Sequence, residues 1–507
     1  EYRENLVIPG GVNLVAEGPA QITARNPIKI IGAADIKIKG FELSPVAYKN
    51  KKDEEVANNA VNIFGSKDIS LTGLIITQPE DAAVRIIRSA PVIISKGSFT
   101  GSGRAKGLAI NNSTVRVSNT RFDDFGTGIH AYSDVEAELT GNLFDQVKDG
   151  VIIGSGSRVT ARGNTLYGLG YKDSDYGFYA NMAELTGAEN TIRGFERGVN
   201  ATNSDLFLRD NFITGNLYGV LVYSGTAKIQ KNTISRNRWD GVVLRQAKKP
   251  RKGDEPVVLT GNSILDNINR AIYVVKRKNI HMAENLFKGN RTGLSTSETS
   301  FTFSRNTLAN NSYGLKIEKD SQGVIENNII AYNSYGVAID ASAKVKLSLN
   351  NVFGNLARKT FPLSDGNYLR WDYLPTEKGD KLRLRIYPAY DLKGETDISV
   401  KPHFVAAGED YHLKAETPLA KFFDQGQSIG AFPIVKMIRK SDTQPEEILP
   451  KLASSNPIVE TVKKPDTRPE EKPRKRVKSK TKAKTAKSPE IRSAGKTKPV
   501  KARSKFA

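Results

Sequence analysis

A short phrase that begins with asparagine and ends with glycine recurs through the centre of the chain, from about residue 119 to residue 351. Two mostly apolar residues follow the asparagine, and further along a glycine precedes an aliphatic residue. Equivalent glycines are separated by roughly 21–22 residues, a spacing typical of solenoids and parallel β-helices. The phrase opens at Asn142, Asn164, Asn190, Asn211, Asn232, Asn262, Asn285, Asn306 and Asn328, and the glycines include Gly150, Gly198, Gly219, Gly241, Gly293, Gly314 and Gly336.

Each repeat contains three short apolar–polar alternations. In one repeat these are residues 220–222, 227–229 and 233–234, which precede Gly241. Alternation with a period of two indicates strands with one buried and one wet face. Like strands of successive repeats, stacked about 4.8 Å apart, form parallel sheets. The sequence therefore predicts an all-β parallel β-helix with three parallel sheets and roughly 22 residues per turn.

The repeated asparagines and glycines have a structural explanation. Glycine enters positive φ freely, so we expect it at a tight turn in each repeat. Asparagine tolerates left-handed turn conformations. Asparagines stacked in register also bond amide to amide along the axis. We therefore expect these residues to build the coil and not to carry chemistry.

The chain divides into three regions. Residues 1–356 form the β-helix, and its opening inside a strand-like phrase indicates that an N-terminal cap or first turn has been removed. Residues 357–435 are expected to form irregular turns and a cap over the open hydrophobic end. Residues 436–507 are rich in Pro and Lys and poor in apolar residues, which predicts a disordered tail. Two repeats carry insertions, at 167–176 and 246–256, which are expected to emerge as loops that form binding rims.

The net charge of +22 is concentrated near the C-terminus. Residues 472–507 contain fifteen Lys or Arg and one acid, Glu490, so 14 of the 22 net charges lie there. Such a tail binds polyanions in a salt-dependent way, and cell-envelope polymers, lipid headgroups and nucleic acid all fit. The absence of cysteine excludes disulfides and thiolate chemistry. No run of eighteen apolar residues exists, so no membrane span is predicted.

The repeat unit, Asn-Thr-Ile followed by Gly-Val and a further aliphatic, resembles that of right-handed parallel β-helix proteins of the pectin-lyase-like superfamily. The opening segment Tyr2–Gly18 and the motifs around Pro402, Asp410, Thr417 and Ile429 resemble entry and closing segments of bacterial members. The likeness covers about residues 2–433 and implies a right-handed coil. Because the superfamily includes lyases, hydrolases, epimerases and adhesins, the fold alone does not select a function.

The resemblance implies that a substrate lies along the strand that follows each glycine. If the first residue after glycine points inward, the residue after that points outward. These outward residues form a column through His130, Tyr179, Asn200 and Tyr273, in which Leu221 and Val243 lie between Asn200 and Tyr273. Two residues further along, a second column contains Tyr132, Tyr223 and Arg245. Aromatic rings beside hydrogen-bonding groups suit sugar rings, and a cation favours uronates. The predicted binding residues are His130, Tyr132, Tyr179, Asn200, Tyr223, Arg245 and Tyr273.

Catalytic residues cannot be assigned from the repeat. Glycoside hydrolysis needs two nearby carboxylates, and the predicted column offers none in its central turns. Acids do precede the repeat glycines, and Asp123-Asp124 forms an adjacent pair. A calcium-assisted lyase would need several carboxylates around one ion and a base, so Ca²⁺ is expected only if the protein is a lyase. With four histidines and no close spacing, no metal site is predicted. The acids that precede the repeat glycines are Asp149, Asp175, Glu196 and Asp240.

The sequence favours an extracytoplasmic polysaccharide-binding protein, periplasmic, secreted or associated with the cell envelope through its basic tail. Its expected partner is a polysaccharide or another anionic polymer, and no cofactor is required. Two alternatives stay open. One is a polysaccharide lyase, hydrolase or epimerase of the same fold, and the other is a structural scaffold or adhesin.

Overall fold

The computed structural model describes residues 2–46, 48–49, 55–56, 58–247, 256–356, 367–374, 383–388, 393–407, 409–414, 416–421 and 429–432. All of them belong to one compact unit, Glu1–Ile438. The predicted tail, and most of the 246–256 insertion, lie outside the described residues. Within the described part, no helix is long and apolar enough to cross a membrane.

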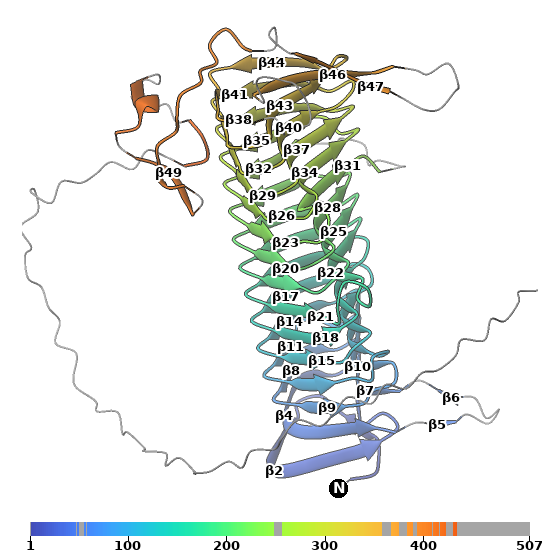
Figure 1. Cartoon of the computed structure of the whole chain (residues 1–507). Helices are drawn as coiled ribbons and strands as arrows, with labels where there is room; N and C mark the ends of the chain where they lie inside the picture. Colours follow the sequence, from blue (N-terminus) through green and yellow to red (C-terminus); the bar gives the residue numbers. More distant parts are fainter. Residues whose placement is uncertain are drawn as a thin grey trace, which may run out of the picture. The chain divides into compact units, whose positions relative to one another are not determined.

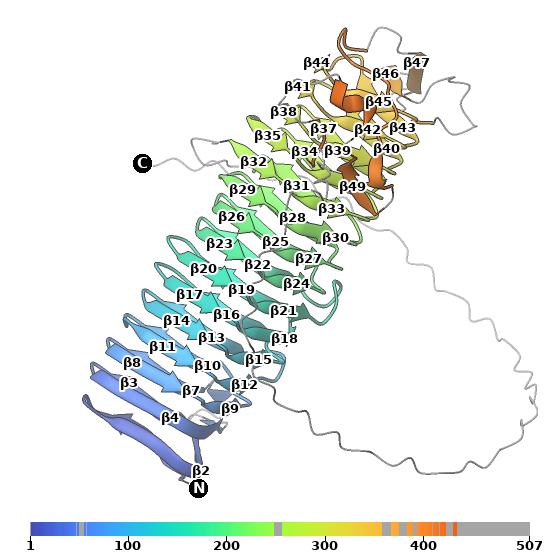
Figure 2. The same ribbon diagram turned by 90° about the vertical axis from the view of Figure 1, so that its left-hand side faces the viewer.

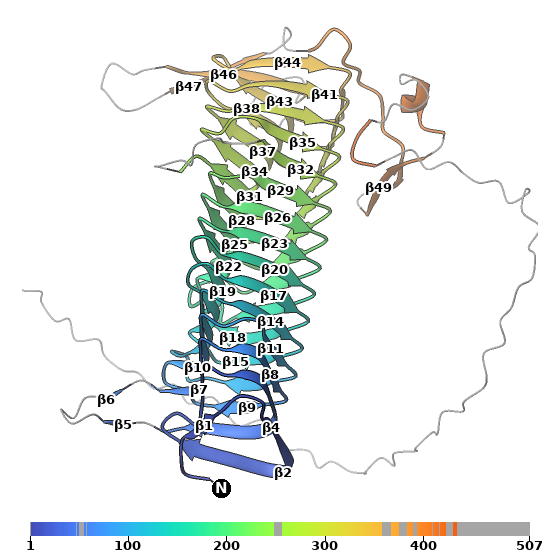
Figure 3. The ribbon, with the colours of Figure 1, turned by 180° about the vertical axis from the view of Figure 1, so that it is seen from behind.

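The chain coils into a stack of about 15 turns, as Figure 1 shows. Each turn contributes one strand to each of three columns, which can be followed in Figures 2 and 3. Strands within a column pair in parallel with the turns before and after. The prediction of three parallel sheets is confirmed, with one refinement: the long β2 and β4 run through two columns and join them into one continuous sheet at the N-terminal end.

Column 1 contains β3 (Ile28–Ile31), β7 (Asn59–Phe64), β10 (Ala82–Ile87), β13 (Lys106–Asn111), β16 (Thr127–Ala131), β19 (Asp149–Ile153), β22 (Tyr176–Asn181), β25 (Arg197–Thr202), β28 (Tyr218–Tyr223), β31 (Val242–Arg245), β34 (Arg270–Val275), β37 (Thr292–Ser297), β40 (Tyr313–Ile317), β43 (Tyr335–Asp340) and β46 (Tyr368–Leu374). It begins with β1 (Leu6–Ile8), which pairs with β3.

Column 2 contains β2 (Asn13–Ala24), β4 (Ala34–Pro45), β8 (Lys67–Thr72), β11 (Val92–Ser95), β14 (Thr114–Ser118), β17 (Glu136–Thr140), β20 (Arg158–Arg162), β23 (Glu184–Ala188), β26 (Asp205–Arg209), β29 (Ala227–Gln230), β32 (Val257–Thr260), β35 (Ile280–Ala283), β38 (Ser300–Ser304), β41 (Gln322–Glu326) and β44 (Lys344–Ser348).

Column 3 contains β9 (Ile75–Thr77), β12 (Ser98–Thr100), β15 (Arg121–Asp123), β18 (Leu143–Val147), β21 (Thr165–Gly168), β24 (Thr191–Arg193), β27 (Phe212–Thr214), β30 (Thr233–Ser235), β33 (Ser263–Leu265), β36 (Leu286–Lys288), β39 (Thr307–Ala309), β42 (Ile329–Ala331) and β45 (Asn351–Phe353). Outside the columns lie the pair β5 (Tyr48–Lys49) and β6 (Glu55–Val56), β47 (Arg383–Pro388), the pair β48 (Phe404–Ala406) and β49 (Asp410–Leu413), and a 3₁₀ turn, η1 (Pro418–Lys421).

The interior of the coil is a continuous apolar core filled by alternate residues of all three columns. The residue after each repeat glycine points inward, as the sequence predicts: Val199, Val220 and Val242 are all fully buried. Stacked rings such as Phe122 and Phe144, 4.9 Å apart, repeat the same contact from turn to turn. Because each turn covers the apolar face of the next, stability accumulates along the stack.

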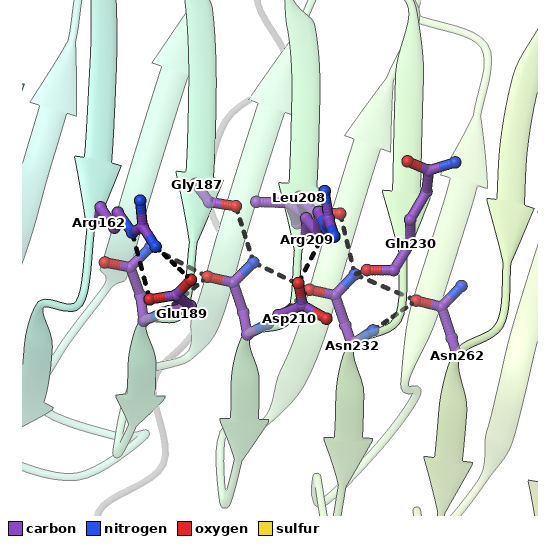
Figure 4. Close-up of polar contacts among 11 residues, drawn as sticks. Arg162, Gly187, Glu189, Leu208, Arg209, Asp210, Gln230, Asn232 and Asn262 are labelled. Atoms are coloured by element: carbon purple, nitrogen blue, oxygen red, sulfur yellow. Dashed lines mark hydrogen bonds and ion pairs between the residues drawn. The ribbon is translucent and has the colours of Figure 1, made fainter.

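The predicted asparagine ladder is confirmed at the turn between columns 2 and 3. The side-chain Nδ2 of Asn211 donates to Asn232 Oδ1 at 2.9 Å and to the backbone oxygen of Gly187 at 2.9 Å. Asn232 bonds Asn262 in the same way, as Figure 4 shows. The buried side-chain amides of the ladder are thereby hydrogen-bonded from turn to turn. The ladder runs through Asn142, Asn164, Asn190, Asn211, Asn232, Asn262, Asn285, Asn306, Asn328, Asn350 and Asp397.

A second ladder, which the sequence analysis did not predict, occupies the turn between columns 3 and 1. Its members follow those of the first ladder by five residues over most of its length, so the signal was present in the sequence. Asn237 Nδ2, for example, donates to Asn267 Oδ1 at 2.9 Å. The ladder runs through Asn216, Asn237, Asn267, Asn290, Asn311, Asn333, Asn355 and Asn367.

The expected backbone roles of the repeat residues were wrong in detail. The first-ladder asparagines are not left-handed; the residue before each one is, for instance Asp210 with φ 54°. Glycines such as Gly219 do not have positive φ either. A Cβ on Gly219 would instead lie 2.4 Å from the backbone oxygen of Gly241, because the strands of adjacent turns approach closely there. Glycine is thus required because the strands of adjacent turns leave no room for a Cβ, and not because the position has a positive φ.

Within the segment expected to cap the open end, the last described residues lie on a flank of the coil. Asp397 continues the first ladder and Ile398 pairs with Asn351, which extends the coil. Phe404, Tyr411 and other apolar residues that follow then pack against outward-facing side chains of column 3, among them Leu286, Ala309 and Ala331. This segment covers a flank of the coil, because the outer side of column 3 becomes apolar over its last turns.

Candidate functional site

Three columns of outward-facing residues run along column 1 between β16 and β34, and we call them together the outer strip. The floor column passes through His130, Ile152, Tyr179, Asn200, Leu221, Val243 and Tyr273, which occupy the same register position in successive turns. The leading column contains Thr127, Asp149, Tyr176, Arg197, Tyr218, Asp240 and Arg270, each placed three residues before its floor residue. The trailing column contains Tyr132, Gly154, Asn181, Thr202, Tyr223, Arg245 and Val275, two residues after the floor.

The strand register of the predicted site residues is the one expected from the sequence. His130, Tyr179, Asn200 and Tyr273 share the floor column, and the remaining three, Tyr132, Tyr223 and Arg245, share the trailing column. The structure thus brings all seven onto one face of the coil. Whether they bind a ligand stays a prediction.

Of the leading column, the sequence analysis named only Asp149 and Asp240, as acids that precede repeat glycines, and it missed the other members. The residue before each repeat glycine lies on the same side of the strand as the floor residue three positions later, so that Tyr176 stacks on Tyr179 with ring centroids 4.7 Å apart. Arg270 likewise lies over the ring of Tyr273, 3.5 Å from its centroid. Strict alternation would place these residues on opposite faces. The available signal for Tyr176 was its place directly before the repeat glycine, Gly177, whereas Arg270 precedes Ala271.

The N-terminal part of the outer strip is a cluster of one cation and two rings. His130 and Tyr132 are stacked with centroids 3.8 Å apart, and Lys106 donates to Asp81 at 3.0 Å. Burial, and the charge of Lys106, lower the pKa of His130. Burial alone would also lower the pKa of Lys106, but Asp81 and Tyr132 raise it overall. The cluster therefore presents a neutral imidazole beside a paired lysine.

The central part of the outer strip contains a carboxyl group with an altered pKa. Burial, and the neighbouring charge of Asp175, raise the pKa of Asp149 to about 6. The backbone N–H of Tyr176 donates to Asp149 Oδ1 at 3.3 Å. Lys148 forms an ion pair with Asp175 at 3.3 Å, and Asp149 itself has no ion pair with another described residue. Asp149 can therefore exchange a proton near neutral pH.

Arginine side chains hold the leading column in place. Arg197 donates to Tyr176 Oη at 2.7 Å and to Glu196 at 2.8 Å. One turn past Tyr218, Asp240 is almost fully buried and accepts two bonds from the Arg270 guanidinium. These contacts fix the rings of Tyr176 and Tyr273 in defined orientations. A pre-organised aromatic surface loses less entropy when a ligand binds.

The 167–176 insertion adjoins the leading column, because it ends at Tyr176. Tyr171 in this loop lies under Arg238, whose guanidinium is 4.7 Å from the ring centroid. Trp239, next to Arg238, is about half exposed at 46%. These two aromatic residues extend the outer strip at its edge. The 246–256 insertion is described only at Gln246, Ala247 and Pro256.

The remaining acids do not assemble into a metal site. Asp123 ends β15 in column 3 and pairs with Arg121 at 3.4 Å, so Asp123-Asp124 lies away from the outer strip. Among the described residues, no three His, Asp or Glu side chains are placed to hold a metal ion.

A family model described as "Right handed beta helix region" matches residues 28–168, 127–287 and 218–359. These overlapping matches span more than half of the chain, so the chain belongs to this family of right-handed parallel β-helices. No curated protein matches it.

Several solved structures are similar to the chain. A mutant of the periplasmic alginate epimerase AlgG has 15% identity, covers 66% of this chain and 79% of its own, and gives a TM-score of 0.41. An exopolygalacturonase from Thermotoga maritima has 12% identity over 68% and 81% of the two chains, with a TM-score of 0.32. A mutant tailspike protein of E. coli bacteriophage HK620, in complex with a hexasaccharide, has 13% identity over 74% of each chain and a TM-score of 0.35.

Proposed function

We propose that the protein binds a polysaccharide along the outer strip, from the turn of His130 to the turn of Tyr273. The observation that carries the proposal is the stacking of ring pairs, His130 with Tyr132 and Tyr176 with Tyr179, on one face of the coil and two turns apart. Rings fixed in this way offer flat apolar surfaces to the C–H faces of sugars, and the adjacent polar groups suit hydroxyls.

The charges of the outer strip favour a neutral polymer over a uronate. Lys106, Lys148, Arg197 and Arg270 each lie within 3.3 Å of a carboxylate of the protein. A ligand carboxylate would have to compete with those acids for the same donors. Arg245 is the exposed cation that has no ion pair with a described residue. One exposed arginine contributes little to anion binding at physiological salt.

Binding is tested with the double variant Tyr179→Ala/Tyr273→Ala in a titration against neutral and uronate-containing polysaccharides. The two stacking surfaces account for about tenfold or more in affinity, so the variant should bind correspondingly less of a neutral polymer. Phe212→Ala is the matched control, because Phe212 is a 45% exposed aromatic on column 3. Equal affinity of the double variant and the control would refute the outer strip as the binding surface.

A second candidate, an enzyme that cleaves or epimerises the bound chain, is favoured by the raised pKa of Asp149. A carboxyl group that titrates near neutral pH can donate or accept a proton in such reactions. The same polysaccharides are incubated with the protein, and unsaturated products and new reducing ends are measured. Binding without either product supports the binder, whereas product that is lost in Asp149→Asn supports the enzyme.

We further propose that the protein lies outside the cytoplasm and that residues 472–507 hold it near an anionic surface. Their excess of fourteen positive charges supports this role. Deleting these residues should abolish salt-sensitive retention on anionic polymer or anionic lipid vesicles, with DNA as a comparison. Retention that persists in the truncated protein would assign the interaction to the coil.

A further inference from the structure

An open hollow of about 490 Å³ lies outside the outer strip, on the turn between columns 3 and 1. It crosses the turn from β39 to β40, the turn from β42 to β43 and the residues that follow β45. Its volume falls within the range of about 300–1,000 Å³ that is usual for small-molecule sites. Asn311 and Asn333 of the second ladder line it, and the residues directly before and after them form its two sides.

The residue before each ladder asparagine forms the first side of the hollow. Asn310, Tyr332 and Gly354 occupy this position in successive turns, with φ of 56°, 60° and 60°. Because Asn310 and Tyr332 adopt this conformation without being glycine, the backbone does not require glycine at 354. A Cβ there would lie 3.3 Å from two ring atoms of Tyr332. The missing side chain at Gly354 therefore leaves room beside the Tyr332 ring.

The residue after each ladder asparagine forms the second side, and it is small and neutral in two of the turns. Ser312 and Ser334 line this side, and their hydroxyl groups have no hydrogen-bond partner among the described residues. In earlier turns of the same corner, charged residues flank the ladder asparagines, among them Arg238, Asp266 and Arg291. None of the described residues that line the hollow is an acid, a lysine, an arginine or a histidine. The corner thus changes from charged to neutral where the hollow lies.

Two sets of contacts hold the groups of the first side in place. Asn310 Nδ2 donates to Tyr411 Oη at 2.7 Å, so the amide keeps its oxygen as an acceptor. The Tyr332 ring packs edge to face with Phe353, at 6.1 Å between centroids, and with Phe404, at 6.5 Å. Burial raises the pKa of Tyr332, which agrees with a site that has no charged neighbour. The hollow therefore offers a fixed aromatic ring beside amide and hydroxyl groups.

These groups select the chemical class of a ligand. An ion would lose hydration there without gaining a counter-charge, and a wholly apolar ligand would leave the hydroxyl and amide groups without partners. A neutral sugar meets both needs, because its C–H face packs on an aromatic ring and its hydroxyls bond amide and hydroxyl groups. We propose that the hollow is a second carbohydrate site, which takes one neutral sugar unit against Tyr332 with hydrogen bonds from Asn310, Ser312 and Ser334. The site is separate from the outer strip and does not depend on the proposed function.

The test measures binding of single sugars to the full chain by ligand-observed saturation-transfer NMR. Glucose, galactose and mannose are each titrated beside the corresponding uronate at neutral pH. We expect at least one neutral sugar to bind about tenfold more tightly than its uronate, because the carboxylate loses hydration and finds no cation. Absence of binding by every neutral sugar, or equal binding of sugar and uronate in each pair, overturns the proposal.

Two variants and a control locate the site. Ser334→Leu fills the hollow and removes a hydroxyl, and it should fold because leucine stands at the equivalent position, 356, one turn later. It should weaken the neutral sugar about tenfold, and so should Tyr332→Ala, which removes the ring. Ser263→Leu is the matched control, because Leu286 follows Ser263 at the same register position of column 3. Equal affinity of Ser334→Leu and Ser263→Leu overturns the assignment.

The double variant Tyr179→Ala/Tyr273→Ala separates the hollow from the outer strip. It should leave binding of the single neutral sugar unchanged, whereas Ser334→Leu should abolish most of it. Binding that is lost in the double variant and kept in Ser334→Leu overturns the second site and leaves the outer strip standing. Binding that is kept in the double variant and lost in Ser334→Leu supports the hollow, whatever the outcome of the polysaccharide titration.

Discussion

Arg270 donates two side-chain hydrogen bonds to Asp240 of the preceding turn, from Nε to Oδ1 at 3.0 Å and from Nη2 to Oδ2 at 2.9 Å. The backbone N–H of Arg270 adds a third bond to Oδ1 at 3.0 Å. The Asp240 side chain is 1% exposed and that of Arg270 21%. Because the guanidinium also covers the ring of Tyr273, one ion pair links two turns of the stack and positions an aromatic residue of the outer strip.

Asp240→Asn should lower the free energy of unfolding by about 3 kcal/mol, because it leaves a largely buried guanidinium without its counter-charge. The measurement is urea unfolding followed by tryptophan fluorescence. Asp210→Asn is the matched control, since the Arg209–Asp210 pair is exposed and should contribute less than about 1 kcal/mol. Equal losses in the two variants would show that burial of the Asp240 pair is unimportant.

Gly219→Ala should be more destabilising than Gly215→Ala, although both remove a repeat-region glycine. A Cβ at position 219 meets the backbone oxygen of Gly241 at 2.4 Å, and neither strand can move without opening the ladder. At position 215 the space is open, and only the positive φ of 66° is unfavourable, worth about 1–2 kcal/mol. Unfolding of the two variants in urea gives the comparison, and the reverse order would contradict the close-approach explanation.

Asp149→Asn should stabilise the protein above pH 6 and have little effect below pH 4. The pKa of Asp149 is raised from 3.8 to about 6 in the folded state, so the folded state resists ionisation that the unfolded state permits. The wild type therefore loses stability relative to the variant as pH rises between these values. The expected difference is about 1–2 kcal/mol, since the group is partly exposed and screened. Stability is measured from urea midpoints between pH 4 and pH 8.

Asp173→Asn serves as the control for this titration, because Asp173 lies exposed in the neighbouring loop. A constant difference between wild type and Asp149→Asn across the whole pH range would contradict the raised pKa. A direct titration of the Asp149 carboxyl by ¹³C NMR, with its midpoint near 6, would confirm it independently.

Much of the architecture could be predicted from the repeat. The asparagine-to-glycine spacing gives the turn length, and the alternation after glycine correctly places Val220 inward and Leu221 outward. The floor column of the outer strip follows from these two facts alone. The first ladder follows as well, because the regular spacing of the asparagines places them next to one another in successive turns. The second ladder was equally regular and was overlooked.

The repeat could not predict the leading column or its partners. Arg270 meets Asp240 across thirty residues because the 246–256 insertion lengthens the intervening turn, while Arg197 meets Tyr176 across twenty-one. Tyr176 lies on the same face as Tyr179, against the strict alternation of a strand. Similarly, nothing local to Phe404 or Tyr411 indicates that they pack beside column 3.

By itself, the sequence determined the coil, because every inward position and ladder position is set by a short period that each turn repeats against its neighbours. Only the tertiary structure decided which outward side chains meet, because these residues are not repeated and their partners come from adjacent turns of unequal length. The paired Arg270 and Asp240 and the raised pKa of Asp149 both arise at that level.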